Sequence, residues 1–229
     1  MKKKLRNLII ILFYLTGIPY LRFLYLRKKY GPLVRIIAFH EIKDNEVEAF
    51  KNKLKFLKNN FNIISPKDFY NQRFSKKKLN ILLTFDDGYK SWLKNVIPYL
   101  KREKISAIFF LDKRGFGLIP ELVQDEHEIG SHTINHLRLP ELSEGRLKEE
   151  VKRKEGIISF AYPFGDKKSF NSKVIEEIKK AGYKYAFTIL PGFNHKKTNK
   201  FLIYRDSLYP EMSNVLFKAW LRGSYDLIK

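Results

Sequence analysis

The chain has 229 residues, of which 44% are hydrophobic and 30% are charged, with a formal net charge of +21 and no cysteine. This hydrophobic content excludes a chain that is disordered throughout and allows one domain of ordinary size or two small ones. The lack of cysteine excludes disulfides, cysteine nucleophiles and thiolate metal sites, so any metal must be held by His, Asp or Glu. The charge favours anionic partners such as acidic lipids, nucleic acid or acidic glycans.

Residues 1–30 are both basic and apolar. They contain eight Lys or Arg residues and no acidic residue, and residues 8–21 carry no charge. Because this stretch is short for a membrane span and contains Gly17 and Pro19, it predicts one of two arrangements: a signal anchor reaching to Leu26, or a kinked helix lying among anionic lipid headgroups. A core helix of the domain is the alternative. We expect membrane association through residues 1–30, but the two basic flanks nearly balance and indicate no membrane side.

From Val34 onward, apolar runs typical of strands alternate with stretches that have helical spacing. Strands are expected at 34–39, 79–85, 105–111, 157–162, 185–190 and 201–205, with a short one near Glu128 and Ile129. Helices are expected at 45–60, 89–103, 142–154, 172–181 and 212–221. This alternation predicts parallel βα units and an incomplete or distorted βα barrel over residues 31–229. In such barrels the chemistry lies where strands end and loops begin.

Two adjacent carboxylates, Asp86 and Asp87, follow the strand expected at 79–85 and precede Gly88. Burying two carboxylates together is costly because like charges repel. A metal ion removes the conflict, since one Asp can bind the cation while the other remains free as a base. The alternative is an ordinary Asp-Gly turn with an Asp helix cap.

Two of the five histidines, His132 and His136, stand four residues apart. This spacing lets both imidazoles reach one ion, and Asp87 would complete a set of two histidines and one carboxylate. Such a set leaves coordination positions open, which suits hydrolysis because bound water can ionise near neutral pH. The alternative is two surface histidines at chance spacing.

Two more polar segments follow strands. In residues 160–166, Pro163 and Gly165 impose a fixed turn that can aim a backbone N–H at a developing oxyanion, although a plain Pro-Gly loop is the alternative. His40 comes directly after the first strand, where it can act as a general acid or serve as a structural histidine.

Taken together, these segments resemble the polysaccharide deacetylases, which form carbohydrate esterase family 4 and contain the NodB homology domain. The resemblance covers residues 36–208 and is carried by Thr84–Gly88, His132–His136 and Tyr162–Gly165. The segments around His40 and Arg205 are most similar to the branch that includes the poly-N-acetylglucosamine deacetylases.

The resemblance implies a distorted (β/α)₇ barrel and a metal-dependent enzyme. The enzyme would remove N-acetyl groups from a glycan of the N-acetylglucosamine type, either a polysaccharide or a lipid-linked sugar, and release acetate. By position, Asp86 would be the base that activates metal-bound water, and Asp87, His132 and His136 would hold the metal. Zinc is the expected divalent metal, and cobalt, nickel and iron are compatible with the same ligands.

The resemblance also assigns roles outside the metal set. The backbone N–H of Phe164 would help to bind the oxyanion, and His40 would protonate the leaving amine. The late Leu-x-His motif that supplies the acid in many members is absent, so His195 remains the alternative acid. An Arg that precedes the third motif in many members is absent too, and Arg205 would orient Asp86 in its place.

Two rival functions remain open at this point. A membrane-tethered, non-catalytic glycan-binding module of the same fold is one, and the complete set of Asp86, Asp87, His132 and His136 argues against it. A nucleic-acid-binding protein is the other. We expect no nucleic-acid partner, because the lysines are scattered and no recognition motif is present. The sequence predicts neither the particular glycan nor the oligomeric state.

Overall fold

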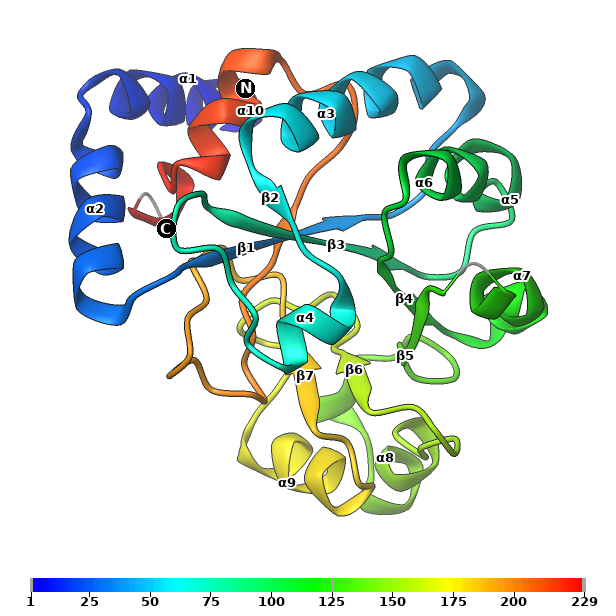
Figure 1. The fold of residues 1–229 in the computed structure, drawn as a ribbon. Helices are drawn as coiled ribbons and strands as arrows, with labels where there is room; N and C mark the ends of the chain where they lie inside the picture. Colours follow the sequence, from blue (N-terminus) through cyan, green and yellow to red (C-terminus); the bar gives the residue numbers. More distant parts are fainter. Residues whose placement is uncertain (1, 125, 228–229) are drawn as a thin grey trace.

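The computed structural model describes residues 2–124 and 126–227. Its strands are β1 Val34–Phe39, β2 Asn62–Ile63, β3 Asn80–Asp86, β4 Ile108–Leu111, β5 Glu128–Ser131, β6 Ser159–Ala161, β7 Tyr185–Phe187 and β8 Asp206–Ser207. All of them pair in parallel in one curled sheet, in the order β7-β6-β5-β4-β3-β1-β8, with β2 added beside β3 (Figure 1). The expected parallel α/β architecture is therefore confirmed.

The segment between β7 and β8 joins the two edges of the sheet. The Ile203 N–H donates to the carbonyl of Ala186 at 3.0 Å, and the Thr188 N–H donates to the carbonyl of Ile203 at 2.8 Å. A few residues later the chain pairs with β1 as β8. The strand expected at 201–205 is therefore wrong, because this segment crosses from one edge to the other and only Ile203 bridges to β7. The result is a distorted barrel that a single crossing segment closes.

Helices surround the sheet. The α-helices are α1 Lys2–Leu15, α2 Ile18–Tyr30, α3 Val47–Asn60, α4 Pro66–Tyr70, α5 Trp92–Asn95, α6 Ile97–Glu103, α7 Ile119–Gln124, α8 Glu144–Glu150, α9 Ser172–Lys180 and α10 Asn214–Leu221. Short 3₁₀ turns are η1 Asp44–Glu46, η2 Lys113–Leu118, η3 Leu139–Glu141 and η4 Tyr225–Leu227. The helix expected at 89–103 is broken at Val96, because Pro98 lacks an N–H and lies in the first turn of α6. The sequence did not predict β2, α4 or α7.

The two faces of the sheet build two apolar clusters. Phe39, Leu83 and Phe109 face the surrounding helices, whereas Leu82 and Phe110 pack inside the barrel. Side chains alternate between the faces of a strand, so the residues two and four places after Leu82 also point inward. This alternation carries Thr84 and Asp86 into the barrel at the carboxyl end of β3.

Helices α1 and α2 form a bent pair that packs beside α10 (Figure 1). The two helix axes differ in direction by 66° across a short break at Thr16 and Gly17. Within the described part of the chain, no helix taken alone has the length and apolar character to cross a membrane; by length and composition, this bent pair taken together does.

Candidate metal centre

Asp87, His132 and His136 converge at the carboxyl ends of β3 and β5. The Oδ1 atom of Asp87 lies 3.4 Å from His132 Nε2 and 3.4 Å from His136 Nε2. The three potential ligand atoms all lie within 4.8 Å of one another. The parallel sheet causes this convergence, because strands paired in parallel deliver their carboxyl ends to the same edge.

The donor atoms of this cluster suit a cation. Asp87 Oδ1 is buried and has no hydrogen-bond partner among the described residues, an arrangement that is costly unless a cation binds there. His132 Nδ1 lies 2.8 Å from the carbonyl oxygen of Ala161, which can only accept a hydrogen bond. Nδ1 must therefore carry the proton, and the lone pair of Nε2 points toward Asp87. A hydrogen bond of this kind is how ligand histidines in metal sites are oriented.

The pKa shifts of Asp87 and His136 both favour the forms that bind a metal. Burial and the neighbouring His132 lower the pKa of His136, which favours the neutral imidazole. Burial alone would raise the pKa of Asp87, but the contact with His132 and the charges of His132, His40 and His136 outweigh it and hold that pKa well below its usual range. A charged carboxylate and neutral imidazoles are the forms that bind divalent metals.

The backbone around the cluster is strained. Seven non-glycine residues among those described have positive φ, and four of them lie here: Asp87 at 86°, Thr133 at 67°, His136 at 55° and Phe164 at 62°. Such conformations cost free energy and collect at functional sites. The loop after Asp87 also needs glycine, since a Cβ on Gly88 would lie 2.3 Å from the Cα of Gly115.

Asp86 forms a buried ion pair with Arg205 beside the metal cluster. The guanidinium donates to both carboxylate oxygens at 2.7 and 2.8 Å, to Thr84 Oγ1 at 3.0 Å and to the carbonyl of Thr188 at 2.9 Å. Burial alone would raise the pKa of Asp86, but Arg205, together with His132 and His40, lowers it overall. Asp86 is therefore held as an ionised carboxylate in a fixed orientation, with the contact to Arg205 that the sequence suggested.

His40 follows β1 on the same edge of the sheet. Its backbone carbonyl accepts a hydrogen bond from Trp92 Nε1 at 2.9 Å, which fixes the turn. Its charge contributes to the low pKa of both Asp86 and Asp87, so the imidazole lies within electrostatic reach of the two carboxylates.

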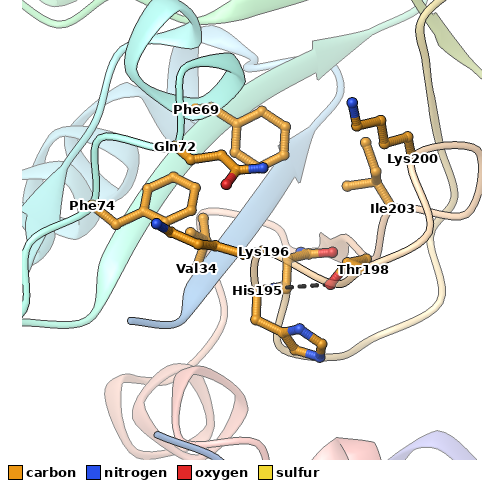
Figure 2. A pocket seen from close by; sticks show the side chains of 10 residues that line it. Val34, Phe69, Gln72, Phe74, His195, Lys196, Thr198, Lys200 and Ile203 are labelled. Carbon is orange, nitrogen blue, oxygen red and sulfur yellow. Dashed lines mark hydrogen bonds between the residues drawn. The ribbon is translucent and has the colours of Figure 1, made fainter. Parts of the chain in front are cut away.

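His195 lies at the opposite end of β1. The preceding residue, Asn194, bridges to Val34, the first residue of that strand, and the imidazole stacks on Tyr30 with ring centroids 4.0 Å apart. Figure 2 shows His195 in a separate pocket, which Phe69 also lines. The six residues of β1 span about 20 Å, so His195 is outside the site.

We expect alanine at His40 to lower the rate of acetate release without releasing metal, and alanine at His195 to change neither. His40 reaches the carboxylates, whereas His195 is separated from them by the length of β1. The measurement is kcat and metal content for both variants, with an effect of about 10²-fold on kcat at His40. A larger effect at His195 would contradict the assignment of His40 as the general acid.

The turn containing Phe164 forms one wall of the site. The Phe164 ring packs against the His136 ring with centroids 4.8 Å apart, and the Arg138 guanidinium lies 4.6 Å from its centroid on another side. Arg138 is held in turn by Asp166 at 2.9 Å. The Phe164 side chain is 45% exposed, so solvent reaches the metal cluster from this direction.

Glu150 belongs to the site but could not be predicted from the sequence. This carboxylate from α8 is 1% exposed and accepts hydrogen bonds from the backbone N–H groups of Ile134 and Asn135 at 3.1 and 2.9 Å, and from the Asn135 side chain at 2.6 Å. It therefore fixes the loop between the two histidines of the cluster. In the sequence it is one of two adjacent glutamates in a charged helix, and only the burial of its helix face distinguishes it.

Glu150→Ala should weaken metal binding by about 10–100-fold, the usual effect of removing a hydrogen bond that orients metal ligands. Glu149→Ala is the matched control, because that side chain is 66% exposed and, among the described residues, its ion pair is with Arg146. Zinc affinity measured by chelator competition checks both variants. Equal affinities for the two would show that Glu150 does not hold the histidine loop.

A second missed group surrounds Asp87. Arg114 Nη2 lies 3.5 Å from Asp87 Oδ1, and Asp112 holds this guanidinium in place through a second ion pair. The Arg114 guanidinium also lies 6.0 Å from the centroid of the Tyr89 ring. The pKa of Tyr89 is raised by burial and by the charge of Asp87. Arg114, Asp112 and Tyr89 do not belong to a recognisable motif, so the sequence gives no signal for their place in the site.

Residues 75–186 of the chain match the polysaccharide deacetylase family. The matched range is just under half of the chain, and the chain is similar to this family there. The range contains Asp86, Asp87, both histidines of the cluster and Phe164, so the similarity includes the centre of the site. His40 and Arg205 lie outside the matched range.

Individual proteins extend the likeness over most of the chain. It is 24% identical to YxkH of Bacillus subtilis over 214 residues, which cover 82% of this chain and 76% of YxkH. It is also 24% identical to the poly-β-1,6-N-acetyl-D-glucosamine N-deacetylase of Staphylococcus aureus, over 79% of this chain and 73% of that protein. The fold matches that of the Streptococcus pyogenes deacetylase PplD, solved in complex with acetate, with a TM-score of 0.69 and 20% identity, over 82% and 98% of the two chains.

Proposed function

We propose that the protein is a metal-dependent hydrolase that removes N-acetyl groups from a glycan of the N-acetylglucosamine type at a membrane surface. The similarity to the polysaccharide deacetylase family supports glycan deacetylation. The observation that supports metal dependence is the buried Oδ1 of Asp87, which accepts no hydrogen bond from the described residues and faces two imidazole nitrogens. Zinc is the first candidate, and this ligand set also accepts cobalt, nickel or iron.

A divalent cation held by Asp87, His132 and His136 would polarise the acetamide carbonyl and acidify water at the site. Residues of the chain then carry out proton transfer and stabilise the oxyanion. Asp86, kept ionised by Arg205, accepts the proton of the attacking water as the new C–O bond forms.

Two further groups serve the second half of the reaction. The backbone N–H of Phe164, in its strained turn beside His136, stabilises the oxyanion. His40 donates a proton to the nitrogen as the C–N bond breaks. The products are acetate and the free amine of the sugar, so one water is consumed for each bond cleaved.

Acetate release from N-acetylglucosamine oligomers is the direct test. The purified full-length chain is assayed as prepared, after chelation, and after zinc or cobalt is added back. Release that falls on chelation and returns with metal supports the proposal. Absence of both bound metal and release would overturn the assignment of Asp87, His132 and His136.

A non-catalytic glycan-binding module of the same fold remains the second candidate, because the late Leu-x-His motif is absent. Glycan binding with one metal per chain and no acetate release would favour it. The ordered pairing of Asp86 with Arg205 favours catalysis, because a binding module has no need of an ionised carboxylate held inside a barrel.

The proposal includes membrane association through residues 1–30, because they combine eight basic residues with a long apolar sequence and contain no acidic residue.

A further inference from the structure

We infer that α1 and α2 dock on a membrane in the plane of the interface, as a rigid part of the catalytic domain, and do not cross the bilayer. This inference rests on the proposed membrane association and is independent of the chemistry at the metal centre. Three observations support it: one side of the helix pair is exposed, the other side is anchored in the domain, and basic residues surround both.

Large apolar side chains are concentrated on the outer side of the helix pair. The described residues contain fifteen exposed large hydrophobic side chains, and ten of them belong to this pair, at 41–69% exposure. We call these ten the apolar face: Leu5, Leu8, Ile9, Leu12 and Leu15 on α1, and Ile18, Tyr20, Leu21, Leu24 and Tyr25 on α2. The spacing on α1 is three or four residues, which places them along one stripe. Water-exposed patches of this kind mark interaction sites.

The inner side of the pair is built into the domain. Ile10 is 0% exposed and Phe23 is 6% exposed, and both belong to the same core cluster as residues of α10. The Phe23 ring packs against Phe193 with centroids 5.6 Å apart. A helix that crossed a bilayer would have to pull these side chains out of the core.

An ion pair with the C-terminal part of the chain and hydrogen bonds to the loop before β3 hold α2 in place. Arg22 Nη1 lies 2.9 Å from Asp226 Oδ2, and Asp226 also accepts from the fully buried Arg35 of β1 at 2.9 Å. Arg27 donates to the backbone carbonyls of Lys76 and Lys77 in the loop before β3. Detaching α2 would remove one of the two arginine partners of the buried Asp226, which is unfavourable.

The bend between the helices results from Thr16, Gly17 and Pro19. Gly17 has a φ of +74°, and the Thr16 hydroxyl donates to the carbonyl of Phe13 at 2.7 Å, which ends α1. Pro19 lies in the first turn of α2 and cannot continue the hydrogen bonds of α1. The bend lets both helices follow the surface of one domain while the apolar face continues across it.

The charge around the apolar face indicates an anionic bilayer as the occupant. Lys4, Arg6, Lys28 and Lys29 are exposed on the pair, and no acidic residue occurs before Glu41. Basic residues that border an apolar stripe are typical of helices lying in the headgroup region. A second copy of this chain is a poorer occupant, because two surfaces of net charge +21 chains repel.

Docking in this way keeps the metal centre accessible. Helix α2 ends at Tyr30, close to the start of β1, whereas His40 and the metal ligands follow the carboxyl ends of the strands. The C-terminal end of α2 and the site therefore lie at opposite ends of β1.

Vesicle flotation tests the surface. The full chain should float with phosphatidylcholine–phosphatidylglycerol vesicles (about 3:1) and bind much less to phosphatidylcholine alone. The double variant Leu12→Asn/Leu21→Asn should lower the partition coefficient by about tenfold or more. Leu93→Asn, which changes an apolar side chain of 39% exposure on α5, should not alter it. Failure of the unmodified chain to float would overturn membrane association itself, and a dimer that hides the apolar face in sedimentation would identify a second copy as the occupant.

Cysteine labelling separates an in-plane helix pair from a span. The chain has no cysteine, so Lys4→Cys, Lys28→Cys and Lys184→Cys each introduce a unique thiol. In sealed membrane vesicles from expressing cells, all three should react with an impermeant maleimide to the same extent before detergent, or all three only after it. If Lys4→Cys and Lys28→Cys differ in their need for detergent, the pair spans the membrane and the in-plane inference is wrong even though membrane association stands.

Discussion

Alanine in place of Asp87 should remove both the bound metal and acetate release. Asp87 Oδ1 lies 3.4 Å from each imidazole Nε2 and is the one anionic atom of the three-ligand cluster. Its loss leaves two neutral donors, so the loss of metal affinity should exceed the 10–100-fold caused by changes around a ligand. His136→Ala should have the same effect, because it too removes one of three protein ligands.

Metal content by elemental analysis and the initial rate of acetate release check this prediction together. His195→Ala is the matched control, since it removes an imidazole about 20 Å away at the start of β1 and should retain full metal and rate. Full metal content in Asp87→Ala or His136→Ala would contradict the ligand assignment. Added zinc should restore the chelated parent protein but neither ligand variant.

Asparagine in place of Asp86 should leave the metal bound and abolish most of the turnover. The amide has nearly the shape of the carboxylate but cannot take up a proton, so we expect kcat to fall by about 10²–10⁴-fold. The same substitution leaves the buried guanidinium of Arg205 without its anionic partner. Breaking a buried pair in this way costs about 3–5 kcal/mol, so the free energy of unfolding should fall as well.

Three measurements separate these effects: kcat, metal content and urea unfolding. Asp44→Asn is the control, because Asp44 pairs with Lys94 on the surface, both side chains are more than 70% exposed, and exposed pairs contribute little to stability. Near-normal turnover in Asp86→Asn would remove Asp86 as the base. Loss of metal in that variant would show that Asp86 is a ligand.

The centre of the site could be predicted because its residues follow apolar strands directly. A parallel sheet brings the carboxyl ends of its strands to one edge, so Asp87 after β3 and His132 after β5 had to lie close together once the alternation of strands and helices was recognised. The choice between His40 and His195 does not follow from local sequence, because it depends on which end of β1 each residue occupies. The pairing of Asn194 with Val34 places His195 at the start of that strand, away from the cluster.

Other parts depended on tertiary contacts that leave no local pattern. Glu150 and Glu149 are adjacent and identical in the sequence, yet only Glu150 is buried against the histidine loop. The crossing segment after β7 was assigned as a strand because it is apolar, although its position depends on where the two sheet edges meet. The composition of residues 1–30 indicated membrane association, but the ion pair of Arg22 with Asp226 involves residues 204 positions apart.

The segment that closes the barrel has a consequence for the time at which the enzyme becomes competent during synthesis. Asp86 and the guanidinium that orients it are 119 residues apart, and Arg205 lies in the stretch that links β7 to β8 and hence to β1. A nascent or prematurely terminated chain ending near residue 190 would already contain all three proposed metal ligands, but Asp86, the proposed base, would lack its partner Arg205. Such a fragment should sequester metal without turning over substrate, so catalytic activity would report that translation has passed Arg205 and that the last strand has docked.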